Sequence, residues 1–155
     1  MRKRILFDNN SIDKVSEHLD EYKKLKKKID FFVCATVIAE LADIPDSKKE
    51  VRLKRLLSFV DIEARLLPDA CFIWGYSIWG NACWGAGKVY ESILNEKGGN
   101  IKDAIIAETA VKNNCVLLTN DKTLYKRMKD HGYDVISHKE LMAQYKCTLG
   151  SDTHE

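Results

Sequence analysis

Short apolar runs of strand length alternate along the chain with longer segments in which apolar residues recur every three or four positions. Runs of the first kind predict buried strands, and the second spacing predicts helices with one buried face. The predicted strands cover residues 4–7, 31–35, 62–67, 116–119 and 134–136. The predicted helices cover residues 12–28, 37–43, 47–60, 101–112 and 122–130.

This alternation of strands and helices indicates the fold class. Nearly continuous apolar strands are typical of a parallel sheet that is covered by helices on both faces. We therefore expect an α/β fold with three layers, α/β/α, around a mainly parallel central sheet. A chain of 155 residues suits one domain, which we expect to span residues 1–149, followed by a flexible tail at 150–155. Thr36 is expected to cap the helix after the second strand.

The segment 70–90 predicts no regular element, because glycines and tryptophans are mixed in it. Trp74, Trp79 and Trp84 recur in this segment every five residues. Three uses are compatible with that spacing: packing in the core, a surface for a protein partner, or flat faces on which nucleic-acid bases stack.

Composition excludes several classes of protein. The five cysteines are odd in number and form no CxxC pair, so neither a disulfide scaffold nor a zinc knuckle is indicated. No secretory signal or membrane span is recognisable, and we expect a cytoplasmic protein. The net charge is only +2, but basic residues cluster at 22–28, 48–49, 54–55 and 122–129. These clusters could guide an anionic substrate, or they could simply be the solvated faces of helices.

Four acidic residues lie where predicted strands end or helices begin, which could be one edge of the sheet. Asp8 and Asp121 follow strands, Glu40 lies one helical turn past Thr36, and Asp103 is in the first turn of a helix. Ligands of parallel α/β sheets bind beyond the carboxyl ends of the strands. Carboxylates gathered there repel one another unless a cation neutralises them, and their hard oxygen atoms suit Mg²⁺ or Mn²⁺.

Each of these acids also has a purely structural interpretation. Asp8 and Asp121 could be turn or cap residues, and Asp103 could complement the dipole of its helix. Glu40 could face solvent, and Asp43 competes with it as a candidate ligand. None of the four histidines forms a metal-spaced pair, and we expect all of them on the surface.

Four segments together resemble the PIN-domain nucleases, and the resemblance extends over nearly the whole chain. They are ILFDNNSID at 5–13, ATVIAEL at 35–41, NIKDAIIA at 100–107 and LLTND at 117–121. The family's first motif usually reads Asp-Thr-Asn, so Asn9 departs from it. At this length the chain resembles the VapC-like ribonucleases, the toxins of type II toxin-antitoxin modules.

The resemblance implies a metal-dependent endoribonuclease whose products carry a 5′ phosphate and a 3′ hydroxyl. It implies that Mg²⁺ or Mn²⁺ is the cofactor, that RNA is the substrate, and that an antitoxin protein and a second copy of the chain are partners. A PIN-like module that binds RNA or protein without cleaving remains the alternative. The implied catalytic and metal-binding residues are Asp8, Glu40, Asp103 and Asp121, with Asn10, Thr119 and Asn120 as hydrogen-bonding neighbours.

Overall fold

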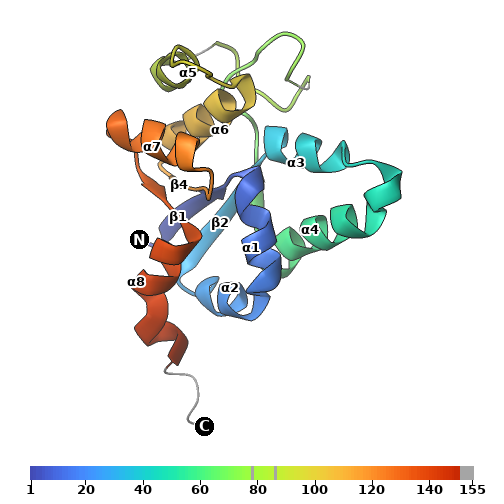
Figure 1. Ribbon diagram of the computed structural model, residues 1–155, viewed down its shortest axis with the longest axis vertical. Helices are drawn as coiled ribbons and strands as arrows, with labels where there is room; N and C mark the ends of the chain where they lie inside the picture. Colours follow the sequence, from blue (N-terminus) through green and yellow to red (C-terminus); the bar gives the residue numbers. More distant parts are fainter. Residues whose placement is uncertain (78, 86, 151–155) are drawn as a thin grey trace.

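A sheet of parallel strands forms the centre of the computed structural model, which describes residues 1–77, 79–85 and 87–150 (Figure 1). The strand order within this part of the chain is β3-β2-β1-β4-β5. Leu6 of the central strand β1 lies opposite Phe32 on one side and Leu117 on the other. The strands are β1 (Lys3–Phe7), β2 (Ile29–Cys34), β3 (Arg65–Leu67), β4 (Val116–Leu118) and β5 (Val135–Ile136).

Helices cover both faces of this sheet. The α-helices of the described residues are α1 (Ile12–Glu17), α2 (Leu19–Leu25), α3 (Ala35–Ala42), α4 (Lys49–Asp61), α5 (Lys88–Leu94), α6 (Ile101–Lys112), α7 (Lys122–Asp130) and α8 (His138–Gly150). Two short 3-10 helices are η1 (Asn9–Ser11) and η2 (Asp46–Lys48).

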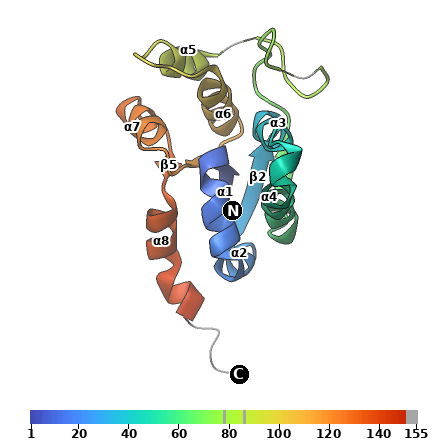
Figure 2. The ribbon, with the colours of Figure 1, turned by 45° about the vertical axis from the view of Figure 1, so that its right-hand side comes forward.

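The order of the strands decides which helices share a face. The connections from β1 to β2 to β3 run toward one edge of the sheet, and the connection from β4 to β5 runs toward the other. Because crossovers between parallel strands are right-handed, helices of these two groups lie on opposite faces. Thus α1, α2 and α4 pack together on one face, while α6 and α7 lie on the other (Figures 1 and 2). The predicted three-layer α/β/α class is confirmed.

Two predicted elements differ from the observed ones. The segment 12–28 forms two helices instead of one, because the backbone breaks at His18, where φ is −120° and ψ is 39°. The strand predicted at 62–67 is shorter, because Ile62 ends α4 and Glu63 turns the chain with a φ of 56°. Helices α5 and α8 were not predicted, and α8 reaches Gly150, while residues 151–155 lie outside the described residues.

Aromatic rings packed around Phe7 join the sheet to the helices on the first face. Phe7 is fully buried, and its ring centroid lies 5.3–5.9 Å from those of Tyr22, Phe31 and Phe59. Cys34, at the end of β2, and Cys115, just before β4, are buried small core residues. No helix in the described ranges is long and apolar enough to span a membrane.

Tyr22 also connects α2 to α8 through its hydroxyl, which shares a 2.9 Å hydrogen bond with Nδ1 of His138. His138 is therefore half-buried and packed, which corrects the expectation that it lies free on the surface. We expect Tyr22→Phe to lower the free energy of unfolding by about 1 kcal/mol, because it leaves a half-buried ring nitrogen without its partner. Denaturant titration measures this loss. Tyr125→Phe is the matched control, because its hydroxyl bonds to Glu140 in an exposed place, and an equal loss in both variants would contradict the expectation.

Candidate active site

Asp8 lies at the centre of the carboxyl edge of the sheet. It follows β1, its backbone N–H donates to the carbonyl oxygen of Leu118, and its side chain is only 2% exposed. Its Oδ2 accepts a 2.7 Å hydrogen bond from the hydroxyl of Thr119, which follows β4 and is fully buried. The two neighbouring strand ends therefore fix the direction of this carboxylate.

Glu40 reaches the same edge from α3. Its side chain is 20% exposed, and its Oε1 lies 3.3 Å from Nζ of Lys102 in α6. The start of α3 is held by Asp69, whose two carboxylate oxygens accept hydrogen bonds from the N–H and the hydroxyl of Thr36, at 3.0 and 2.8 Å. The expectation that Thr36 caps α3 is therefore wrong. Thr36 lies inside the helix, and Asp69 supplies the capping oxygen atoms instead.

The other two acids are positioned by helix starts. Asp103 is in the first turn of α6, which is capped by the side chain of Asn100. Asp121 caps α7, because its Oδ1 accepts from the N–H groups of Thr123 and Leu124 at 2.8 and 2.9 Å. The structural interpretation of Asp121 therefore holds. Its second carboxylate oxygen receives neither of these two bonds.

Electrostatics connect all four carboxylates. Burial raises the pKa of Asp8 to about 6, and the negative charges of Glu40 and Asp121 act in the same direction. Burial likewise raises the pKa of Asp103 to about 6, with further contributions from the other three acids. The ionisation of Asp8 and of Asp103 is thus opposed by the charges of neighbouring acids. The fold gathers the four predicted acids into one electronegative site.

The donor set of this site fits a hard divalent cation. Carboxylate oxygens are the ligands that Mg²⁺ and Mn²⁺ prefer, and a cation would relieve the repulsion described above. In addition, Oδ1 of Asn9, next to Asp8, is buried without a hydrogen-bond partner among the described residues. Within the ranges 1–77, 79–85 and 87–150, however, no three Asp, Glu, His or Cys side chains are already arranged as ligands of one ion. Binding would therefore require side-chain rearrangement, beginning with the ion pair between Glu40 and Lys102.

Of the remaining predicted residues, only some lie beside the four acids. Thr119 contacts Asp8 as described, but the side chain of Asn120 accepts a 3.2 Å hydrogen bond from the N–H of His138 and so supports the start of α8. Asn10 is exposed in η1. Asp43, the competitor of Glu40, is exposed at the end of α3.

Sequence reasoning missed two residues of the site, Lys102 and Asp69. Lys102 lies beside Asp103 in the third motif, so a basic neighbour of the acids could have been noticed there. Asp69 gave no signal, because its partner Thr36 is 33 positions away in the sequence.

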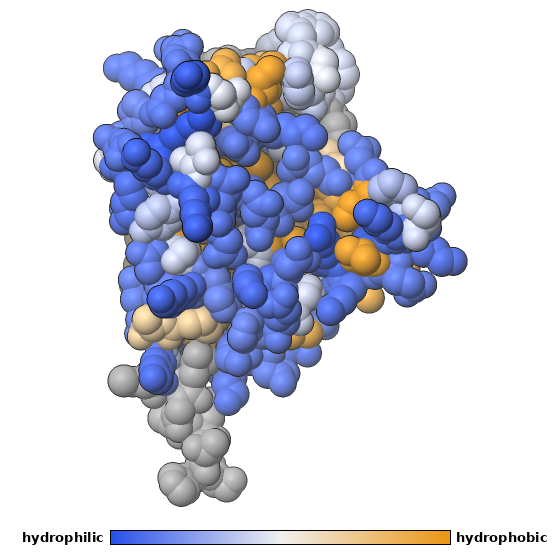
Figure 3. All heavy atoms as spheres, in the orientation of Figure 1, coloured by the Kyte–Doolittle hydropathy of each residue, from blue (hydrophilic) through white to orange (hydrophobic). Residues whose placement is uncertain are grey.

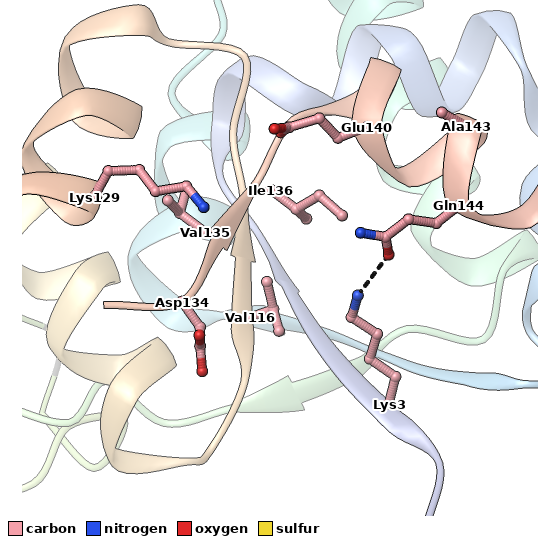
Figure 4. A pocket seen from close by; sticks show the side chains of 9 residues that line it. All are labelled: Lys3, Val116, Lys129, Asp134, Val135, Ile136, Glu140, Ala143 and Gln144. Carbon is pink, nitrogen blue, oxygen red and sulfur yellow. Dashed lines mark hydrogen bonds between the residues drawn. The ribbon is translucent and has the colours of Figure 1, made fainter. Parts of the chain in front are cut away.

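Open cavities flank the acids on two sides. One, of about 260 Å³, lies between α3, α6 and the loop before α5. Another, of about 440 Å³, lies beside Asp121 and the first turn of α7. A third, of about 450 Å³, lies away from the acids between α7 and α8, where Lys3 donates to Gln144 (Figure 4). The cavity of about 260 Å³ is lined by Thr36, Ala39, Glu40, Asp43, Gly75, Tyr76, Lys102 and Ile105.

Three solved structures share the fold of the chain at low sequence identity. PAE2754 from Pyrobaculum aerophilum is 17% identical, with a TM-score of 0.64 over 95% of this chain and 98% of that one. A domain of a functionally unknown protein from Methanocaldococcus jannaschii is 22% identical, with a TM-score of 0.52 over 87% and 90%. The PilT N-terminus domain protein SSO1118 from Sulfolobus solfataricus is 14% identical, with a TM-score of 0.52 over 98% of both chains.

Comparison with curated proteins finds no significant match. The family model described as PIN domain, in contrast, matches residues 12–130, which is well over half of the chain. The matched region contains three of the four acids, and Asp8 lies just before it. The chain therefore belongs to the PIN domain family.

Proposed function

We propose that the protein is a metal-dependent endoribonuclease and acts as the toxin of a toxin-antitoxin module. PIN domains are in general nucleases, and the chain belongs to that family. The observation that carries the proposal is that Asp8 and Asp103, whose pKa values burial raises, also lie within reach of the negative charges of Glu40 and Asp121 at one edge of the sheet. Acids whose charges oppose one another's ionisation are concentrated at functional sites of proteins.

In this mechanism Asp8, Glu40 and Asp103 are the residues that would hold Mg²⁺ or Mn²⁺. Such an ion, when bound, lowers the pKa of a coordinated water and offsets charge on the scissile phosphate. Asp121 would either join the ligands or orient the attacking water. Thr119 keeps Asp8 in one orientation by donating to its Oδ2.

Lys102 has a separate part in this mechanism. Its side chain is 40% exposed and pairs with Glu40. With Glu40 as a ligand of a cation, the ammonium group of Lys102 would be available for a phosphate oxygen of the substrate. Attack by water in line with the leaving group then yields a 5′ phosphate and a 3′ hydroxyl.

The substrate and partners of the proposal follow from the resemblance to VapC-like toxins. They are RNA, an antitoxin protein and a second copy of the chain, in the cytoplasm. Basic side chains near the site include Lys122 at the start of α7, which lines the cavity beside Asp121. A cationic side chain at this place attracts an anionic strand.

The test is cleavage of a panel of structured and single-stranded RNAs by the purified chain. We expect cleavage with Mn²⁺ or Mg²⁺, none with a chelator, and recovery when excess metal is returned. Mapping the product ends would check the predicted 5′ phosphate. Binding of RNA or of a partner protein without cleavage under any metal condition would refute the catalytic proposal and favour a PIN-like binding module.

A further inference from the structure

The loop between β3 and α5 has an unusual composition and exposure. Residues 70–87 include no Asp, Glu, Lys, Arg or His, and they contain all three tryptophans of the chain. Trp74, Trp79 and Trp84 are 71%, 65% and 72% exposed. Packing of these rings in the core, one of the three uses compatible with their spacing, is therefore wrong. Large apolar rings held in solvent in this way mark an interaction site.

The three rings are gathered by repeated Trp-Gly pairs. The glycine after each tryptophan, Gly75, Gly80 or Gly85, has a positive φ of 81°, 82° or 91°. A Cβ added at any of these glycines would meet nothing within 4 Å, so glycine is needed for the backbone conformation and not for lack of space. Each pair thus turns or bends the chain directly after an aromatic ring.

Phe72 is the centre on which the rings converge. Its ring centroid lies 5.4, 5.0 and 5.1 Å from those of Trp74, Trp79 and Trp84. Trp79 also contacts both other tryptophans, at 5.5 and 5.8 Å. We call Phe72 and the three tryptophans the aromatic cluster. In Figure 3, pale side chains gather at the top of the molecule, where Figure 1 places this loop, next to the strongly hydrophilic surface of the same face.

The base of the loop is tied to the body of the domain. Asp69 exchanges backbone hydrogen bonds of 2.8 Å with Asn81 and Cys83, and the N–H of Ala70 donates to the hydroxyl of Thr109 in α6. Because Asp69 also holds the start of α3, the loop and the helix that carries Glu40 share one anchor. The cluster is therefore presented on a fixed base close to the site.

The same loop forms one wall of the cavity beside the acids. Gly75 and Tyr76 face Glu40 and Lys102 across about 260 Å³. A strand whose phosphate lies at the acids and near Lys102 therefore has Tyr76 beside it. Trp74 and Trp79 of the aromatic cluster are two and three residues from Tyr76 in the sequence.

We propose that the aromatic cluster and Tyr76 form a stacking platform for the bases of single-stranded nucleic acid that enters the acidic site. This inference rests on the proposed nuclease function and adds the strandedness of its substrate. Exposed aromatic faces bind bases of any sequence, because every base has a π-face, and they need no charge of their own when cationic groups such as Lys102 meet the phosphates. Bases inside a duplex are already stacked and cannot use such a platform.

Binding measured with a chelator tests the platform separately from cleavage. Because all three tryptophans lie in the loop, quenching of the intrinsic tryptophan fluorescence by an oligonucleotide reports contact at this loop alone. Anisotropy of a labelled single-stranded oligonucleotide gives the affinity. We expect Trp79→Ala to weaken that affinity about tenfold, and Trp79→Phe to retain most of it, because a flat ring remains. Leu57→Ala, at an exposed apolar residue of α4, is the control and should leave affinity unchanged.

Four outcomes would overturn the platform. The first is that the unaltered chain does not bind the oligonucleotide, and the second is that Trp79→Ala binds it as tightly as the unaltered chain does. The third is that the chain binds duplex and single strand with equal affinity. The fourth is self-association in sedimentation that Trp79→Ala abolishes without changing the affinity for the oligonucleotide. The last outcome would assign the cluster to a second copy of the chain. Trp-dependent binding without cleavage after metal is restored would refute only the nuclease function. Cleavage of single strands with no dependence on Trp79 would refute only the platform.

Discussion

Replacing Asp8 with Asn is expected to abolish RNA cleavage and, at the same time, to stabilise the metal-free protein at pH 8. The loss of activity should be at least about 100-fold, because the change removes the most buried carboxylate of the proposed metal site. The gain in the free energy of unfolding should be about 2 kcal/mol, because a buried negative charge is replaced by a neutral group of the same shape. The Asn side chain can still accept the hydrogen bond from Thr119.

The pH dependence of that gain has a definite sign. The pKa of Asp8 is about 6 in the folded protein, compared with an ordinary value of 3.8. The folded protein therefore binds this proton more tightly than the unfolded protein does. Ionisation of Asp8 therefore destabilises the fold fully above pH 6, and the effect disappears as pH falls below 3.8. Denaturant titrations of both proteins should differ at pH 8 and agree near the lower value.

Asp13→Asn is the matched control for this comparison. Asp13 is an exposed acid that pairs with Arg55 at 2.8 Å, so its replacement should give no gain at pH 8. Added Mg²⁺ or Mn²⁺ should raise the melting temperature of the unaltered chain and not that of Asp8→Asn. Retained cleavage by Asp8→Asn would show that the acids do not carry the chemistry. Absence of the pH-dependent gain would show that Asp8 is not a destabilising buried charge.

The sequence was sufficient to predict the layers, and to place Asp8 and Asp121 at strand ends, because both depend on local pattern. The strands β1, β2 and β4 are uninterrupted apolar runs, and burial on both faces of a parallel sheet is what such runs indicate. Asp8 directly follows a strand, and Asp121 lies three residues beyond the end of β4. Topology then brings them together, because neighbouring strand ends meet at one edge.

Features that depend on distant residues were not predictable in this way. The break at His18 has no Gly or Pro to mark it. The exposure of the three tryptophans contradicts the usual burial of such rings and depends on turns at glycines, not on hydrophobic pattern. The capping of α3 by Asp69 joins residues that are 33 positions apart.

Asp69 is the residue on which the site and the loop both depend. It is only 1% exposed, and its carboxylate satisfies the N–H and the hydroxyl of Thr36 while its backbone ties the base of the loop. Burial raises its pKa, and the hydrogen bonds from Thr36 oppose that rise. The hydrogen bonds therefore offset part of the burial penalty of the charge, and their loss would leave two buried polar groups of Thr36 unpaired.

We therefore expect Asp69→Ala to lower the free energy of unfolding by about 3 kcal/mol and to reduce cleavage, because the first turn of the helix that carries Glu40 is no longer held. Asp69→Asn keeps one oxygen acceptor for the N–H of Thr36 and should lose about half as much stability. Thr36→Val removes the hydroxyl alone and isolates the second bond. Denaturant titration and metal-dependent cleavage, measured on all three variants, separate stability from positioning. Full activity in folded Asp69→Ala would show that α3 finds its place without this anchor, and that Glu40 is positioned by its contacts with α6 instead.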